Sequence, residues 1–368
     1  MRPIWAEINL DKARHNAEEI RRFVGKEVLI MAIVKANGYG HGALPVSLEI
    51  EEVVDMYGAA ILEEALLLRE GGVKKPILVL GYTRPEDYGL LLERDIIQTV
   101  YSMDQALALE AVASGGNQVA RVHLKIDTGM NRLGFSDGEE TLEVIRAIEG
   151  LSHVRIEGIF SHIANGGSGD LSYSRRQLER YGTFVKKAET LLGRTVLKHL
   201  ANSATMVELK EAHFDMVRPG LMLYGSFSTR DDNIKHLNLK KIMELKGILS
   251  QIKEVGVGEP ISYNGTFVTK RVTQVGVLPL GYGDGFARAL SNRGSVLIGG
   301  VRVPIIGNVC MDQLMLDLTD AGEVQVGAEV LIYGEENPVE DFASLLGTIS
   351  YEVYCAVSER IPRIYVRS

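Results

Sequence analysis

A lysine that directly follows a long apolar run is the residue of this chain best placed to do chemistry. Residues 28–34 are all apolar, and Lys35 comes next. A run of this length predicts a strand buried on both faces, so the Lys35 amine should lie where the apolar interior ends. Partial burial lowers the pKa of an amine and makes its neutral, nucleophilic form accessible near neutral pH. For this segment alone, a solvated lysine in an ordinary turn is the competing interpretation.

The residues after Lys35 are suited to holding a ligand. Glycine at every second position from 38 to 42 lets the backbone approach a ligand closely. Tyr39 and His41 lie between these glycines and carry polar tips. The spacing is not the glycine fingerprint of a nucleotide-binding loop, so it predicts a cradle without naming the ligand. His41, like His199 farther along the chain, is also compatible with a packing or turn role.

Strands and helices must bring the other parts of a site to Lys35, and the chain alternates between them. The expected strands are residues 28–34, 56–61, 76–81, 96–101, 120–127, 154–162, 199–202 and 214–223. Helix-period segments lie between them. Eight such repeats predict an α/β fold of the (β/α)8 TIM-type barrel rather than an open doubly wound sheet. We assign residues 1–235 to this barrel domain.

The pattern changes near residue 235. Charged residues cluster at 231–236, and short alternating strands separated by glycines follow them. The expected strands are residues 245–255, 272–279, 294–297, 301–306, 313–318 and 329–333. They predict a C-terminal, mainly-β domain over residues 236–368.

In a barrel of this type, active-site groups follow the carboxyl ends of the strands. The residues that could bind a ligand or take part in catalysis follow the expected strands in this way: Lys35, Asn37, Tyr39, Tyr82, Asp127, Met130, Arg132, His162, Asn202, Ser203, Arg218, Gly220 and Tyr224. A lysine, fixed cations and phosphate-binding hydroxyls and amides suit an anionic heteroaromatic ligand, and no acidic cluster suited to a divalent metal accompanies them. Pyridoxal 5'-phosphate fits that set. We therefore expect this cofactor and no metal.

Composition argues against several other classes of function. The chain has a net charge of −8 and no basic block, so nucleic acid is not expected as a partner. Its two cysteines, Cys310 and Cys355, lack CxxC spacing, which favours a reducing compartment over a disulfide framework or a zinc site. The N-terminal residues lack the apolar core of a signal peptide, and no apolar run approaches the roughly twenty residues that cross a bilayer. We expect a cytoplasmic protein without a membrane partner.

Eight short segments, taken together in their order, closely resemble the alanine racemase family. They are residues 34–42, 125–134, 161–162, 201–203, 217–220, 281–285, 310–312 and 350–353. The similarity runs from Ile4 to Arg363. Related barrels that bind pyridoxal phosphate share the first segment, whereas the full ordered set is specific to this family. The resemblance implies interconversion of L- and D-alanine, which in a bacterium would supply D-alanine for peptidoglycan.

The resemblance implies two catalytic bases. Lys35 would hold the cofactor through an imine and then act as the base on one face of the substrate carbon. Tyr263 matches the base on the opposite face, which in the family comes from the partner subunit. Racemisation needs a proton to leave one face and another to arrive on the other, which two flanking groups achieve. We therefore expect a homodimer with shared active sites.

Cations should assist Tyr263, because a phenol with an unperturbed pKa of about 10 is a poor base near neutral pH. His162 and Arg218 match the family residues that favour the phenolate by hydrogen bonding. Arg218 would also donate to the pyridine nitrogen. Because a guanidinium stays protonated, the ring becomes a weaker electron sink, which favours racemisation over transamination.

The remaining matches concern binding. The residues that match the family's phosphate ligands are Tyr39, Ser203, Gly220, Leu221 and Tyr351. Asn202 matches another residue that contacts the cofactor. Arg132 matches a contact to the cofactor hydroxyl and the substrate carboxylate. Met311 matches the partner-chain amide at that carboxylate. The resemblance also implies that Tyr282 and Tyr351 would form a narrow gate that admits a small side chain. Lys125 matches a lysine that is carbamylated in some members.

Several alternatives stay open from the sequence. An ion pair between Lys125 and Asp127 competes with the carbamate. Tyr354, three residues after Tyr351, competes for the phosphate role, since both would share one helical face.

Departures from the family pattern widen the possible functions. Asn131 stands where glycine is frequent in the family, and residues 165–169 suggest a shortened loop. A racemase of broader specificity that also accepts serine is therefore an alternative.

Two further alternatives lie outside racemisation. A fold-related decarboxylase would place an acidic residue, not Arg218, at the pyridine nitrogen. A non-catalytic carrier of pyridoxal phosphate would lack the C-terminal domain.

Overall fold

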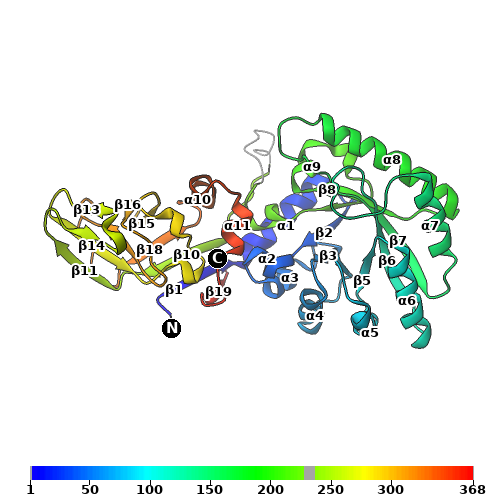
Figure 1. Cartoon of the computed structure of the whole chain (residues 1–368), viewed down its shortest axis with the longest axis horizontal. Coiled ribbons are helices and arrows are strands. Elements are labelled where there is room, and N and C mark those ends of the chain that lie inside the picture. The colour runs from blue at the N-terminus through cyan, green and yellow to red at the C-terminus, as the bar shows by residue number, and fades with distance from the viewer. Residues whose placement is uncertain (1, 228–236, 368) are drawn as a thin grey trace.

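The chain forms two bodies arranged along one long axis, with a barrel at one end and a mainly-β domain at the other (Figure 1). The computed structural model describes residues 2–227 and 237–367. The charged cluster at 231–236 and the boundary expected at residue 235 lie outside the described residues.

Eight parallel strands of the described residues close into a barrel in chain order. They are β2 (Leu29–Ile33), β3 (Met56–Ala59), β4 (Ile77–Val79), β5 (Ile97–Val100), β6 (Ala120–Lys125), β7 (Val154–Phe160), β8 (Leu197–Asn202) and β9 (Met216–Arg218). Strands β2 and β9 complete the closure, with Leu29 opposite Met216 and Ile30 opposite Val217. The strands are largely buried, as expected where a packed interior and outer helices cover both faces. The predicted TIM-type barrel is confirmed.

Helices surround the barrel (Figure 1). They are α1 (Leu10–Val24), α3 (Ala43–Ile50), α4 (Leu62–Glu70), α5 (Tyr88–Glu93), α6 (Met103–Gly115), α7 (Glu139–Glu149), α8 (Ser172–Leu192) and α9 (Ser203–Glu208). Helix α1 buries the stripe Ala13, Ala17 and Ile20 at helical spacing. Its N-terminus is capped by Asn9, whose side chain accepts the Lys12 amide at 2.9 Å.

The C-terminal domain is built on a sheet of nine described strands, in the order β11-β14-β17-β16-β15-β18-β10-β1-β19. Their bounds are β1 (Ile4–Asn9), β10 (Met243–Ile248), β11 (Gln251–Val255), β14 (Thr273–Leu278), β15 (Ser295–Ile298), β16 (Val301–Ile306), β17 (Leu314–Asp317), β18 (Glu329–Tyr333) and β19 (Arg363–Val366). A separate hairpin pairs β12 (Pro260–Ile261) with β13 (Phe267–Val268). Residues 245–255, expected as one strand, are divided between β10 and β11. Helices α10 (Val339–Leu346) and α11 (Ser350–Cys355) complete the domain.

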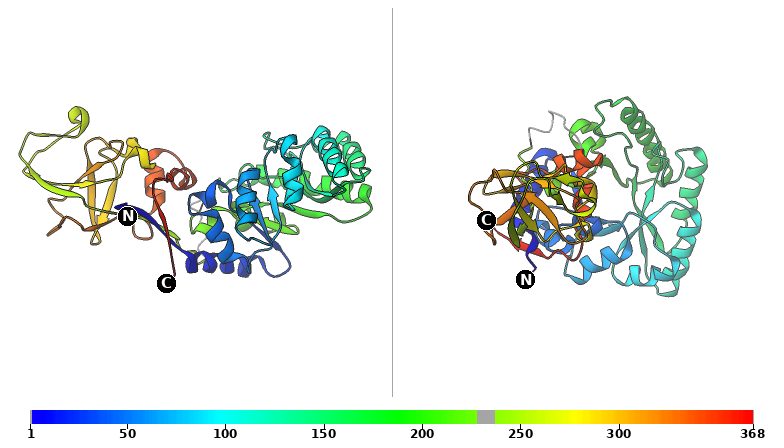
Figure 2. Two further views of the ribbon diagram at one scale, coloured as in Figure 1. Left: turned by 90° about the horizontal axis from the view of Figure 1, so that it is seen from below. Right: turned by 60° about the vertical axis from the view of Figure 1, so that its left-hand side comes forward.

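Strand β1 joins the beginning of the chain to the C-terminal domain. It pairs antiparallel with β10, from Ile4 opposite Gly247 to Ile8 opposite Met243, and parallel with β19. The sequence analysis grouped residues 1–235 with the barrel. Strand β1 nevertheless lies in the other sheet, and the barrel begins after it with α1. Segments from the beginning and the end of the sequence, β1 and β19, consequently lie side by side in one sheet (Figure 2).

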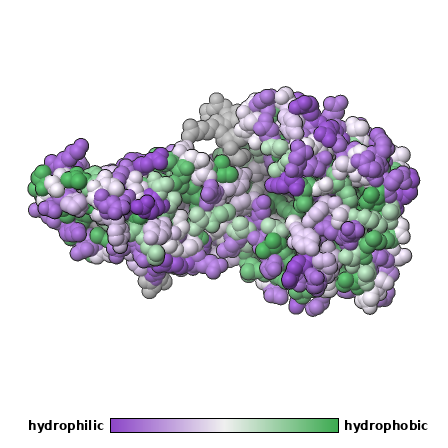
Figure 3. Space-filling model, viewed as in Figure 1, coloured by the Kyte–Doolittle hydropathy of each residue, from purple (hydrophilic) through white to green (hydrophobic). Residues whose placement is uncertain are grey.

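The surface is mixed over the barrel, with apolar patches at the far end of the C-terminal domain (Figure 3). Exposed apolar side chains of that domain include Val257, Val268 and Val272. Among the described residues, no helix is both long enough and apolar enough to cross a membrane.

Ile8→Ala should destabilise the C-terminal domain, although residue 8 precedes the barrel in sequence. Removing most of a buried isoleucine lowers the free energy of unfolding by about 2–5 kcal/mol. The amides of β10, which face β1, should then lose protection against hydrogen exchange. Mass spectrometry measures this loss, with Leu48→Ala on the exposed face of α3 as the control. Loss of protection confined to the barrel would contradict the pairing.

Candidate active site

The chain makes a left-handed turn directly after Lys35. Segment α2 (Lys35–Tyr39) has positive φ at Ala36 (52°), Asn37 (52°) and Tyr39 (51°), as well as at its glycine. In this conformation the Cβ atom of an L-residue lies too close to the following carbonyl oxygen, so several consecutive residues with positive φ are strained. Strain of this kind persists only where surrounding contacts enforce it, and it is concentrated at functional sites. The sequence analysis did not foresee the turn.

Side chains from neighbouring segments hold this turn. Asn37 accepts the amide of Ala43 at 3.0 Å through its Oδ1 atom. Glu64 on α4 accepts the amide of Ala36 at 2.6 Å and that of Ala60 at 2.7 Å, which links the ends of β2 and β3. Burial, with a smaller contribution from the positive charge of Arg132, lowers the pKa of the Lys35 amine. The neutral form of this amine is therefore more accessible than in a solvated lysine.

The residues predicted to bind phosphate converge from four segments. The Gly220 amide, just after β9, donates to Ser203 Oγ at 2.8 Å. A Cβ atom at Gly220 would lie 2.8 Å from the Tyr39 hydroxyl, so glycine is needed for this approach. The ring of Tyr351, on α11, lies 5.5 Å from the ring of Tyr39. Leu221 is buried next to Gly220. Hydroxyls and backbone amides thus gather beside the Lys35 turn.

The structure also distinguishes Tyr351 from its competitor Tyr354. Tyr354 is buried, with its ring 4.7 Å from that of His41 and 5.9 Å from that of Tyr333. Its hydroxyl lies 3.1 Å from Ser226 Oγ. Tyr351 is therefore the tyrosine of α11 that contacts Tyr39.

Asn202 has a local role in this arrangement. Its side chain caps α9 by accepting the Thr205 amide at 3.1 Å, which sets Ser203 at the first position of the helix. The amide group of Asn202 thus positions the Ser203 hydroxyl.

A buried guanidinium lies at the end of β9. Arg218 donates to the carbonyls of Ser161 and Leu200 at 2.8 and 2.9 Å. It also donates to Nδ1 of His199 at 3.0 Å and to Nδ1 of His162 at 3.2 Å. Burial lowers the pKa of Arg218 to about 10, so the group stays protonated at neutral pH.

Three histidines around Arg218 are kept neutral. His199 Nε2 lies 2.9 Å from Nδ1 of His123, so the network extends one residue farther from Arg218. Burial first, and the Arg218 charge second, lower the pKa of His162 and His199 well below the usual range. Burial lowers the pKa of His123 to about 3. From the sequence, only a packing or turn role was expected for His199 and none for His123. The available signal was that both residues fall on predicted barrel strands, which are β6 and β8, on either side of β7.

Lys125 is a buried amine among cations. Its Nζ atom lies 4.7 Å from the centre of the Phe160 ring. Burial, then the charges of Arg218 and Arg132, lower its pKa well below the usual range. Within the described residues, no ion pair joins Lys125 to Asp127. The neutral form of this amine is therefore favoured relative to a solvated lysine.

Asp127 instead organises the turn that carries Arg132. Its carboxylate accepts the amides of Gly129, Asn131 and Arg132 at 2.8, 3.0 and 3.0 Å. These bonds lower the pKa of the carboxyl despite its partial burial. Asn131 has φ of 55°, which explains why glycine suits this position and why asparagine, tolerant of left-handed backbone, can replace it.

Three predicted site residues lie together on turns of the C-terminal domain. The Tyr282 amide donates to Cys310 O at 3.0 Å, and Asn308 donates to the Tyr263 carbonyl at 2.8 Å. Tyr263, Tyr282 and Met311 are 70%, 44% and 53% exposed. The Tyr263 turn immediately precedes β13, which lies at the end of the molecule remote from the barrel (Figure 1). Within one chain, the predicted site therefore exists as two separate groups.

Known proteins resemble both bodies of the chain. The family models described as alanine racemase, N-terminal domain, and alanine racemase, C-terminal domain, match residues 8–227 and 242–365. Alanine racemase of Desulforamulus reducens is 45% identical over 99% of each chain. Alanine racemase 2 of Caldanaerobacter subterraneus subsp. tengcongensis is 44% identical over 100% of this chain and 95% of its own.

Solved structures extend the likeness to the arrangement of the whole chain. Alanine racemase of Clostridium difficile 630 superimposes with a TM-score of 0.97 at 35% identity, covering 100% of this chain and 97% of its own. Alanine racemase of Bacillus anthracis with bound L-Ala-P gives a TM-score of 0.92 at 32% identity, covering 100% and 96%. Together with the barrel lysine and the turns of the C-terminal domain, these matches show that the chain belongs to the alanine racemase family.

Proposed function

We propose that this chain interconverts L- and D-alanine at a pyridoxal-phosphate site that two copies complete. One observation supports this most: the Lys35 amine, with a lowered pKa, lies beside a cradle of hydroxyls and amides and on the same barrel as the buried Arg218. The product D-alanine would serve peptidoglycan synthesis. Both cysteines are free thiols, in keeping with the proposal of a cytoplasmic enzyme.

The barrel residues fit the cofactor. Tyr39, Ser203 and Tyr351 offer hydroxyls for a phosphate group, and Gly220 and Leu221 offer backbone amides next to them. Lys35 provides the amine for covalent attachment. When bound, pyridoxal phosphate acts as an electron sink that acidifies the α-hydrogen of the attached amino acid.

Arg218 tunes this site by remaining charged. With a pKa near 10 it keeps its protons at neutral pH and can donate a hydrogen bond to the ring nitrogen without transferring a proton to it. This limits the electron withdrawal that competing reactions require, so racemisation is favoured. Neutral His162, 3.2 Å from Arg218, can accept from the guanidinium and remains near the substrate side of the barrel.

Two faces of the substrate carbon need two proton carriers. Lys35 serves one face from the barrel. Tyr263 serves the other from a second copy, because its turn lies at the end of its own chain that is remote from its own barrel. The phenol is 70% exposed in the single chain and belongs to a domain end with exposed apolar side chains, as expected of a surface that another copy covers.

We further propose that Lys125 is carbamylated. Its neutral amine can attack carbon dioxide, forming the N–C bond and releasing one proton to give an anionic carbamate. The negative charge would lie between Arg132 and Arg218, the two cations that depress the pKa of the free amine.

Isotope exchange tests the reaction. Incubated with pyridoxal phosphate and L-alanine in deuterium oxide, the protein should yield D-alanine deuterated at the α-carbon, and Lys35→Ala should slow this by at least about a thousandfold. Chiral chromatography with mass spectrometry measures both, and L-serine in parallel measures substrate range. If L-alanine keeps its configuration in the presence of the wild-type protein, the proposed activity is refuted. If Lys35→Ala racemises alanine at the wild-type rate, the role of Lys35 is refuted.

Mixed dimers test the sharing of sites. Lys35→Ala and Tyr263→Phe should each be inactive alone, but their heterodimer contains one site with both native groups. A random mixture should recover about a quarter of the wild-type rate, since half the dimers are mixed and each has one intact site. A mixture of Lys35→Ala with the Lys35→Ala/Tyr263→Phe double variant is the inactive control. No recovery in verified heterodimers would disprove the shared site.

Labelled bicarbonate tests the carbamate. After equilibration with 13C-bicarbonate, the protein should give a 13C NMR carbamate signal that Lys125→Ala lacks, because Lys125 is the buried amine with a strongly lowered pKa. The same signal in Lys125→Ala would place the modification elsewhere, and its absence from both proteins would refute it.

A further inference from the structure

Arg360 joins the two turns that carry Tyr282 and Met311. It follows α11 and donates from Nη2 to Asp312 Oδ1 at 2.7 Å. Its Nε atom lies 3.4 Å from Asp284 Oδ1. Asp312 is next to Met311, and Asp284 lies two residues after Tyr282. One guanidinium therefore spans both turns, and we call Arg360, Asp284 and Asp312 the clamp.

The two turns are themselves joined through the backbone. The amide of Gly283 donates to Met311 O at 2.9 Å, next to the bond from Tyr282 to Cys310. A Cβ at Gly283 would overlap the Arg360 guanidinium, and one at Gly281 would overlap the carbonyls of Cys310 and Met311. The turn containing Tyr282 is thus tightly fitted on the side that faces Arg360.

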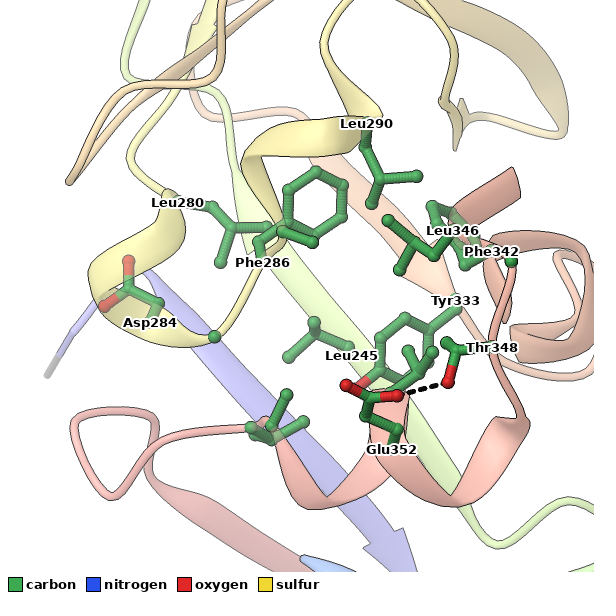
Figure 4. A pocket seen from close by; sticks show the side chains of 16 residues that line it. Leu245, Leu280, Asp284, Phe286, Leu290, Tyr333, Phe342, Leu346, Thr348 and Glu352 are labelled. Carbon is green, nitrogen blue, oxygen red and sulfur yellow. Dashed lines mark hydrogen bonds between the residues drawn. The ribbon is translucent and has the colours of Figure 1, made fainter. Parts of the chain in front are cut away.

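The segment that follows Tyr282 borders a cavity. A cavity of about 370 Å³ lies between Asp284–Ala287 and the helices α10 and α11 (Figure 4). Its walls include Phe286, Leu290, Phe342, Leu346, Val353 and Val357. A void forfeits the dispersion contacts that would otherwise fix a segment. Residues 284–287 therefore lack part of these contacts, which leaves a larger share of the positioning of the adjacent Tyr282 to the clamp and to the backbone hydrogen bonds.

Asp284 is the buried end of the clamp. Its side chain is fully buried, accepts the Gly281 amide at 3.1 Å and also pairs with Arg2. The Ser358 amide donates to the Asp284 carbonyl at 3.1 Å, which fixes the turn to the chain that leaves α11. Helix α11 in turn presents Tyr351 to Tyr39 of the same chain.

We propose that Arg360 is a positioning residue that holds Tyr282 and Met311 in place for the substrate of the partner's barrel. This proposal rests on the shared site proposed above. Because the same segment carries α11, the clamp links residues that serve one active site to a helix that serves the other.

Arg360→Ala should affect substrate binding more than folding. The side chain of Arg360 is 49% exposed, and exposed ion pairs contribute little to stability. Asp284 keeps its contact with Arg2, so the fold should persist. The KM for alanine should rise about fivefold, the scale of one lost hydrogen bond, with kcat changed less than about twofold.

Arg271→Ala is the matched control. Arg271 lies in the same domain, is 48% exposed, and pairs with Asp320 and Asp317 away from both turns. It should change neither KM nor the exchange of the Tyr282 and Gly283 amides, whereas Arg360→Ala should accelerate that exchange. Equal effects of the two variants would overturn the proposal.

A double-mutant cycle tests the route through Asp312. Asp312→Asn should raise KM in the same direction, and the double variant Arg360→Ala/Asp312→Asn should be no worse than the stronger single variant. Arg360→Lys keeps the charge but not the fork that reaches two carboxylates, so it should restore only part of the lost affinity. If the effects of the two single substitutions on KM were additive in the double variant, Arg360 would not act through Asp312.

Heterodimers isolated by two affinity tags give the decisive comparison. In the first, one chain carries Lys35→Ala together with Arg360→Ala and the other is wild type; in the second, the two substitutions are on different chains. The first should show the raised KM, because its working barrel is completed by the chain lacking Arg360, and the second should show the wild-type KM. The reverse pattern would disprove the shared site, while equal KM values would disprove the role of Arg360.

Discussion

A guanidinium buried without a carboxylate adds to the effect of burial on the charge state of the groups around it. In the described residues, Arg218 is satisfied by two carbonyls and two imidazole nitrogens and by no ion pair. Desolvating a cation is costly, so each of these acceptors is required. The uncompensated positive charge then makes protonation of nearby bases unfavourable. It contributes to neutral histidines and to the lowered pKa of Lys125.

Barrel closure brings this charge and the reactive amine into one site. Strands β2 and β9 are neighbours in space although they begin and end the barrel in sequence. Lys35 and Gly220 follow these two strands, and the Tyr39 hydroxyl approaches Gly220 because the chain turns left-handed after Lys35. The strain of that turn is therefore coupled to the contact between Tyr39 and Gly220, two of the residues proposed to hold the phosphate.

The parts of this structure that were predictable depend on local pattern. The barrel strands could be found because strands buried on both faces form unbroken apolar runs. Strand β1 was not placed, because its partners, residues 243–248 and 363–366, are distant in sequence. The family motifs predicted the individual residues of the candidate site. They did not supply Glu64, whose contacts appear only when β2 and β3 lie side by side, or His123, which looks like an ordinary buried histidine.

The pairing of β1 also constrains synthesis on the ribosome. Strand β1 is made before both of its neighbours: β10 begins at Met243, and β19 ends at Val366. All barrel strands emerge between them, so the barrel can fold while β1 is still without a partner. An unpaired strand edge invites pairing with other chains. Strand β1 can therefore pair with β10 only after every strand of the barrel has been translated.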